Sequence, residues 1–225
     1  MKFSFLTIFT FLVILLFPAA CSSFQPVKER TQVNLRGPTF ELGTVDAQFN
    51  KYLIPGLLKN DITVSYYPDD DVVCMSFRHN FTNHYLFWSG KNRPVFINAL
   101  TEYKQAYEER NLPAGNRRTK RAYGTVRGFA IWESTKFSMQ GTSHPNVDIG
   151  YQFANKMPYF TITQNEAPNE NQVTKEALPK NSAITIFFTR SQADALVALF
   201  NSDIIRNFSN TPDTASNDPD IEEFF

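Results

Sequence analysis

Two histidines and a run of three aspartates lie close enough in the sequence to be considered as ligands of a metal ion. His79 and His84 flank a short polar loop, and Asp69–Asp71 fill the turn before the strand that leads to His79. A convincing metal site needs three or four ligands at established spacing. The turn and the loop are predicted at opposite ends of one strand, roughly seven residues at 3.3 Å each, too far apart to share an ion. We therefore expect no metal and no other cofactor.

Two further positions could supply a nucleophile. Ser143-His144 stands beside Pro145, but no Gly-x-Ser-x-Gly motif surrounds the serine. Cys74 lies in an apolar run that predicts a buried strand, which is typical of an inert core cysteine. No phosphate-binding loop or dinucleotide motif occurs. We expect a protein that is not an enzyme, although two of its 22 acidic residues could still converge as a carboxylate pair.

The first 20 residues have the layout of a signal peptide. Lys2 is followed by an uncharged run, Phe3–Phe17, and then by Pro18-Ala19-Ala20-Cys21. This run is shorter than the roughly 20 residues that a membrane-spanning helix needs. The full sequence contains 22 phenylalanines. The chain that remains after cleavage is long and apolar enough to bury a substantial core.

The cleavage region LFPAAC resembles the lipobox of bacterial lipoproteins, in which small residues precede a cysteine that is diacylated. Ala19, Ala20 and Cys21 fit, whereas Pro18 stands where that family usually has an aliphatic residue. The resemblance implies a protein held stably on a membrane by lipid on Cys21. Ser22 is not the aspartate that retains many lipoproteins at the inner membrane, which favours the outer membrane, facing the periplasm or the exterior. Ordinary cleavage after Ala20 remains the alternative.

Charge is distributed unevenly along a chain of zero formal net charge. The last 19 residues, Asn207–Phe225, hold five acids and no lysine or arginine, which leaves 22 basic against 17 acidic residues elsewhere. This mild excess is far from the basic stripe of a nucleic-acid-binding protein. The basic run Arg117–Arg121 could contact acidic lipid headgroups or a partner, and a solvated loop is the simpler interpretation.

Hydrophobic periodicity predicts antiparallel strands and two helices. The helices begin near Asn92 and Ser191, and an amphipathic turn or two is expected within 45–58. The strands are expected at residues 39–42, 62–67, 72–78, 85–88, 124–133, 147–153, 159–163 and 183–189.

Both halves of the chain thus place several strands before one helix. A shift of 100 residues sets Leu86–Ser89 beside Ile186–Thr189. We expect an α+β fold, antiparallel sheets each followed by a helix, with two pseudo-repeats at about 60–111 and 122–206. These would form one domain, 38–206, between a lipidated tether, 21–37, and a disordered acidic tail, 207–225.

This layout resembles the repeats of the Pur-alpha or whirly type, in which a curved four-stranded antiparallel sheet precedes a helix. The resemblance covers about residues 60–206 and rests on element order alone. It implies binding of single-stranded nucleic acid through basic and aromatic residues on the sheet. We do not transfer that activity to an exported chain, because fold does not determine function.

These observations favour a cell-envelope lipoprotein that binds or scaffolds and does not catalyse a reaction. Its partners would be the membrane, through the lipid, and another envelope protein, with no nucleic acid. The candidate binding surface is the sheet face that the helices leave uncovered, with Tyr67, Trp88, Phe129 and Trp132 as its aromatic residues. Two alternatives remain: a hydrolase of an envelope polymer and, if the chain is not exported, a single-stranded nucleic-acid-binding sheet protein.

Overall fold

The computed structural model describes residues 37–50, 56–115, 118–134, 139–171 and 179–209. All of them belong to one compact unit, residues 31–220. The signal peptide, Cys21, nearly all of the tether and residues 210–225 of the acidic tail lie outside the described residues. The predictions made for those segments therefore stay predictions. The predicted start of the disordered tail at residue 207 is wrong, because residues 207–209 end a helix, Asp203–Ser209, and the Phe208 ring lies 5.0 Å from that of Phe40.

In the described residues, ten strands form one antiparallel sheet in the order β5-β8-β9-β10-β1-β2-β3-β4-β6-β7. The strands are β1 (Phe40–Asn50), β2 (Leu57–Tyr67), β3 (Val72–His79), β4 (Thr82–Ser89), β5 (Gly124–Arg127), β6 (Phe129–Ser134), β7 (Met139–Ser143), β8 (Asn146–Ala154), β9 (Met157–Gln164) and β10 (Ile184–Phe188). The helices are α2 (Arg93–Glu108), α3 (Arg190–Phe200) and α4 (Asp203–Ser209), with 3-10 turns η1 (Pro68–Asp70) and η2 (Thr119–Arg121).

The two ends of the sheet are joined by one long, bent hairpin. Only Gly128 separates β5 from β6, and only His144 and Pro145 separate β7 from β8. The pairs Gly124–Ile149 and Ala130–Ser143 share one register, and the Gly128 N–H donates to the Pro145 carbonyl at 2.9 Å between them. Because β6 also pairs with β4 and β8 with β9, the sheet curls into a closed circuit of strands.

Glycine is required at the bend of this hairpin. A Cβ atom at residue 128 would lie 2.9 Å from Val147 Cγ2 and 3.4 Å from Leu86 Cδ1. Both neighbours belong to the main core, where close packing leaves little room for them to move. The close approach of two strands at Gly128 therefore depends on the absence of a side chain.

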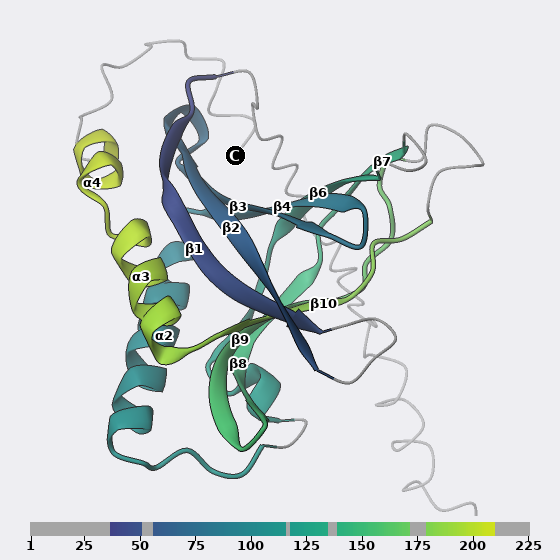
Figure 1. The fold of residues 1–225 in the computed structure, drawn as a ribbon. Helices are drawn as coiled ribbons and strands as arrows, with labels where there is room; N and C mark the ends of the chain where they lie inside the picture. Colours follow the sequence, from purple (N-terminus) through teal and green to yellow (C-terminus); the bar gives the residue numbers. More distant parts are fainter. Residues whose placement is uncertain (1–36, 51–55, 116–117, 135–138, 172–178, 210–225) are drawn as a thin grey trace, which may run out of the picture. The chain divides into compact units, whose positions relative to one another are not determined.

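The inner face of the curled sheet carries the main hydrophobic core, on which α2 and α3 pack (Figure 1). The alternate residues Val45, Ala47 and Phe49 of β1 are buried there. Trp88 lies 4.7 Å from Phe96 of α2, and Phe96 lies 4.6 Å from Phe200 of α3, measured between ring centroids. These rings join both helices to the sheet.

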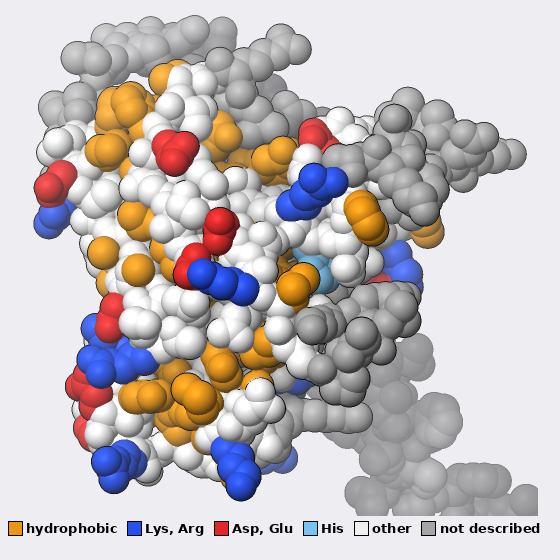
Figure 2. Space-filling view, in the orientation of Figure 1, with side chains coloured by type: hydrophobic (Ala, Val, Ile, Leu, Met, Phe, Trp, Pro, Cys, Tyr) orange, Lys and Arg blue, Asp and Glu red, His pale blue; other side chains and the backbone are white. Residues whose placement is uncertain are grey.

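Ion pairs tie α2 to α3 on the solvent side of this core. Lys104 contacts Asp194 at 2.6 Å, and Arg190 contacts Glu108 at 3.1 Å. Figure 2 shows charged side chains of both signs along the left edge, where the helices lie in Figure 1. These half-exposed pairs fix the relative register of the two helices more than they stabilise the fold.

The predicted α+β class with separate sheets is wrong, because the fold is predominantly β. The outermost strands of the two halves pair with each other, so that Gln48 of β1 faces Phe187 of β10 and Leu86 of β4 faces Ala130 of β6. Each of α2 and α3 does follow a run of strands, but the two runs share one sheet. Local periodicity could not show that the halves are joined.

The amphipathic turns predicted within residues 45–58 are also wrong for residues 45–50, 57 and 58, whereas residues 51–55 lie outside the described residues. The described part of this range belongs to the long strands β1 and β2, which pair from Phe40–Tyr66 to Asn50–Leu57. The spacing of Val45, Ala47 and Phe49 is the period of a strand, and these three residues are buried together. The helices predicted from Asn92 and Ser191 are confirmed as α2 and α3.

A buried arginine fixes the start of α2 on the β2–β3 turn. Arg93 donates to both carboxylate oxygens of Asp71, at 2.7 and 3.0 Å, and to its carbonyl oxygen at 3.0 Å. The Tyr66 hydroxyl donates to the same carboxylate at 2.9 Å. Asp71 itself has a φ of 48°, in the left-handed region that asparagine and aspartate tolerate best.

We expect Asp71→Asn to lower the free energy of unfolding by about 1–2 kcal/mol, because the substitution removes the charged acceptor and leaves Arg93 buried beside a neutral amide. Asparagine keeps the size of the side chain and tolerates the left-handed backbone. Urea unfolding measures the effect, with Asp69→Asn, at an exposed position in the same turn, as the matched control. Equal losses in both variants would show that the Arg93 contact is not the cause.

Candidate binding face

The outer face of β2, β3, β4 and β6 carries a second apolar cluster, to which none of the described helices contributes. The strand registers place Ser65, Cys74, Phe87 and Phe129 in one row across the four strands. The next row runs through Ser76, Tyr85 and Ile131. We call this surface the aromatic face, and define it by Tyr67, Val72, Cys74, Tyr85, Phe87, Phe129 and Ile131.

A continuous line of rings crosses the aromatic face. The ring centroids of Tyr67 and Phe87 are 6.1 Å apart, those of Phe87 and Phe129 5.4 Å, and those of Phe129 and His144 5.1 Å. Phe87 at the centre is only 3% exposed, whereas Tyr67, Tyr85 and Phe129 are half-buried. The face therefore offers an apolar centre bordered by partly exposed rings, as binding surfaces commonly do.

Acidic groups form the rim of the face on the side of β6 and β7. His144 Nδ1 lies 2.8 Å from Glu170 Oε2, and Gln140 donates to Glu133 at 3.3 Å. Burial, with a further contribution from the Glu133 carboxylate, raises the pKa of Tyr85. Tyr85 therefore stays a neutral phenol that can donate a hydrogen bond. A ligand of this face would meet rings at its centre and carboxylates at its edge.

Ser143 and His144 do not form a nucleophile and base. Ser143 pairs with Ala130, is fully buried and belongs to the inner face, whereas the His144 ring contacts Phe129 on the outer face. Adjacent residues of a strand project to opposite faces, which separates the hydroxyl from the imidazole. Burial also raises the pKa of the Cys74 thiol, so that Cys74 is a protonated core residue.

The structure brings together only two of the four aromatic residues predicted for the binding surface. Tyr67 and Phe129 both contact Phe87 on the aromatic face. Trp88, 1% exposed, lies on the inner face beneath α2, and its indole N–H faces Met75 Sδ at 3.2 Å. Trp132 is 3% exposed and lies over Gly141. Trp132 pairs with His84, whose ring stacks on Phe77 of the main core, so both tryptophans lie on the inner face and away from the aromatic face.

The sequence reasoning missed Tyr85 and Phe87 of the aromatic face, its smaller apolar members Val72, Cys74 and Ile131, and the rim pair of His144 and Glu170. The alternation of Tyr85 with Phe87 would have placed both on the face of Tyr67 once the register was known. His144 and Glu170 come from distant loops and meet only through the fold. Nothing in their sequence context indicated the pairing.

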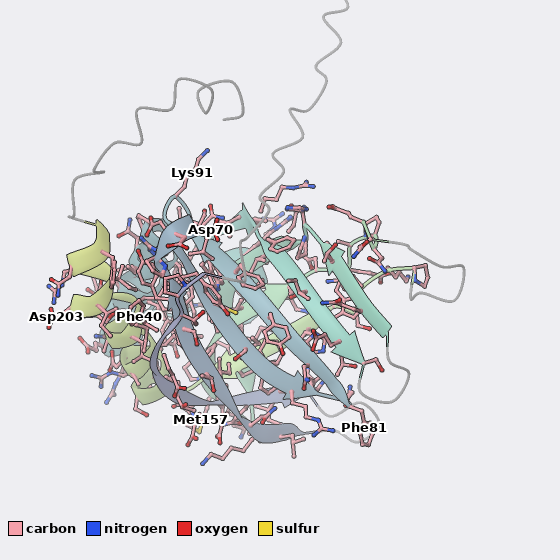
Figure 3. The ribbon with its side chains drawn as sticks, turned by 90° about the horizontal axis from the view of Figure 1, so that it is seen from above. Phe40, Asp70, Phe81, Lys91, Met157 and Asp203 are labelled. Atoms are coloured by element: carbon pink, nitrogen blue, oxygen red, sulfur yellow. The ribbon has the colours of Figure 1, made fainter. Side chains whose placement is uncertain are left out.

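The histidines and aspartates considered as metal ligands lie at opposite ends of β3. Figure 3 shows Asp70 and Phe81 at the two ends of the β3–β4 pair. His79 stacks on Phe49 and His84 on Phe77, with centroid distances of 5.3 Å each. Within the described residues, no three His, Cys, Asp or Glu side chains are grouped as a metal site would require.

A shallow depression of about 370 Å³ between α2 and the start of α3 is a weaker candidate. Its charged lining residues, Arg190 and Asp194, already take part in ion pairs with α2. The first turn of α3 is capped by the side chains of Thr189 and Gln192, which accept from the backbone N–H groups of Gln192 and Thr189 respectively. The depression offers a ligand little that is not already used.

Comparison with known proteins yields one family. A family model described as "Uncharacterised Treponema protein" matches residues 39–207. The comparisons with curated proteins and with solved structures gave no significant match. Among the described residues, no helix is long and apolar enough to cross a membrane.

We expect the stability of the protein to fall as the pH drops from 6.5 towards 4. Burial lowers the pKa of His84 to about 4, while the unfolded chain takes up its proton near pH 6.5. Protonation therefore favours the unfolded state in this window, by about 3 kcal/mol at pH 4. Urea unfolding of wild type and His84→Phe at pH 7 and pH 4.5 measures the difference. Parallel pH profiles would contradict this role of His84.

Proposed function

The chain belongs to the family described as "Uncharacterised Treponema protein", and from this premise we propose that it is a bacterial cell-envelope lipoprotein that binds a partner protein. The aromatic face is the binding surface in this proposal, and no catalytic step is assigned to the chain. The lipid anchor is the cysteine of the lipobox-like sequence, Cys21.

The observation that supports binding is the line of rings from Tyr67 to His144 on a face to which none of the described helices contributes. Aromatic residues supply much of the energy of protein interfaces, because a rigid ring buries a large area at a small cost in entropy. Phe87 and Ile131 already form a dry centre, so a partner would need to cover only the half-exposed rings around it.

The rim indicates the charge of the partner. Glu133 and Glu170 border the aromatic face, and the exposed Arg78 lies in the same row as Glu133, through the pairs Arg78–Asn83 and Asn83–Glu133. This rim of both signs favours a partner with complementary charged and hydrogen-bonding groups around an apolar centre. A single-stranded nucleic acid needs a positively charged groove, which one arginine beside Glu133 does not supply.

The binding proposal is tested by site-specific photocrosslinking in cells, with a benzophenone side chain in place of Tyr85. We expect an adduct of one defined mass that disappears when Phe129→Glu is added, because a charge there disrupts the apolar surface. The same probe at Leu58, exposed on β2 outside the aromatic face, is the control. An adduct of equal yield from Leu58, or one unaffected by Phe129→Glu, would rule out this face.

The anchor is tested by metabolic labelling with palmitate. Wild type should carry the label and sediment with membranes, and Cys21→Ala should lose both, because two acyl chains are needed for stable retention. Cys74→Ala is the matched control, since the only other cysteine is buried in the described domain. An unlabelled, soluble wild type would disprove the lipid anchor and leave the binding face untouched.

A further inference from the structure

The β8–β9 hairpin ends in a turn with an unusual surface. Asn155 and Lys156 form the turn with φ angles of 51° and 66°, and Phe153 and Met157 flank it. Phe153 is 40% exposed and Met157 50%, so two large apolar side chains near a lysine are partly open to solvent, although the Phe153 ring also lies 6.1 Å from that of Tyr151. Partly exposed apolar side chains beside cations can together contact a surface outside the chain.

The basic run noted in the sequence packs against this same hairpin. The backbone of η2 lies so close to β8 that a Cβ atom on Gly150 would be 2.1 Å from the Thr119 carbonyl oxygen. The Tyr123 N–H donates to the Ile149 carbonyl at 3.0 Å, and the Tyr151 hydroxyl donates to the Pro113 carbonyl at 3.1 Å. One hydrogen bond before η2 and one after it thus hold the cations of η2 next to β8.

The cations of this region are exposed and are not neutralised by the described residues. Lys120, Arg121 and Lys156 are exposed, and none of them forms an ion pair in the described part of the chain. Asp148, the nearest acid along β8, accepts hydrogen bonds from Thr125 and Asn165 instead. Lysine and arginine side chains line the lower edge in Figure 2, where the hairpin ends in Figure 1. We call Lys120, Arg121, Phe153, Lys156 and Met157 the basic tip.

We propose that the basic tip docks on the surface of an anionic lipid bilayer. The cations would lie among the headgroups, and Phe153 and Met157 would enter the boundary between headgroups and acyl chains. This inference rests on the proposed membrane anchor, to which it adds a second contact that orients the protein on its membrane.

The three cations and the apolar pair, Phe153 and Met157, together favour an anionic bilayer over other partners. A soluble polyanion would use the three cations but has no need of Phe153 and Met157. A bilayer uses both, and each lysine or arginine near an anionic membrane surface contributes about fivefold to binding. Ala154 and Met157 form the last pair of the hairpin, so only the Asn155–Lys156 turn lies beyond it and Met157 stands directly beside Lys156.

The experiment is cosedimentation with lipid vesicles, using the chain that begins at Ser22. This chain lacks the lipid but keeps the whole compact unit, residues 31–220. The vesicles contain phosphatidylcholine alone or with about 30% phosphatidylglycerol, at about 0.1 M salt. We expect binding to the anionic vesicles only. The triple variant Lys120→Gln/Arg121→Gln/Lys156→Gln should bind about a hundredfold more weakly, and Phe153→Ser/Met157→Ser about tenfold more weakly.

A second triple variant, Lys59→Gln/Lys180→Gln/Arg206→Gln, removes the same charge from cations that form ion pairs elsewhere. It should bind within about threefold of wild type, because its cations do not belong to the tip. Equal losses in the two triple variants would reduce the effect to net charge and overturn the proposal. An unchanged Phe153→Ser/Met157→Ser variant would point to a soluble polyanion and overturn it as well.

Failure of this proposal can be told apart from failure of the proposed function. If wild type does not bind anionic vesicles although Cys21 is labelled by palmitate, the membrane contact of the basic tip is disproved and the lipid anchor is supported. If the chain without lipid binds the vesicles and Cys21 is not labelled, the membrane contact of the basic tip is supported and the lipid anchor is disproved. Each variant must retain the urea midpoint of wild type for its binding to count.

Discussion

The hydrogen bond from Gly128 to Pro145 is the contact on which the rest of the structure depends. It keeps the β5–β8 ladder and the β6–β7 ladder in one register while the hairpin bends, and so joins the two ends of the sheet. Closure encloses the inner face, where Trp88, Phe96 and Phe200 meet. A side chain at residue 128 would push the two strands apart at the bend and disturb the enclosure of this core.

The aromatic face reaches the same bend at one end. Phe129 directly follows Gly128, and His144 directly precedes Pro145, so their 5.1 Å ring contact lies at the corner of the sheet. The corner also brings His144 to Glu170, which comes from the segment after β9. The Phe129–His144 contact continues the register of the β6–β7 ladder, one position beyond the Ala130–Ser143 pair. The row from Cys74 through Phe87 to Phe129 likewise follows from the pairing of β3, β4 and β6.

Local chemistry predicted the local elements well. Pro94 and the spacing of Phe96, Leu100 and Tyr103 indicated α2, and the alternation on both sides of Pro68–Asp71 indicated the β2–β3 hairpin. The Asn92 side chain, expected to cap α2, donates instead to the Arg127 carbonyl. The pairing of β1 with β10 was not predictable in this way, because no local pattern encodes which distant edge a strand will meet. For the same reason Trp88 was misplaced: without register, the choice between Phe87 and Trp88 as the outward residue was open.

The pairing of Gln48 with Phe187 also has a consequence for how the protein reaches its folded state. β1, the first strand of the chain, pairs with β10 near the end of the domain. The native topology therefore has many contacts between residues distant in sequence, and such topologies fold slowly. A growing chain cannot close the circuit until β10 has been made. For a protein exported as proposed here, this delay keeps the polypeptide loose enough to thread through a narrow translocation channel before it folds on the far side.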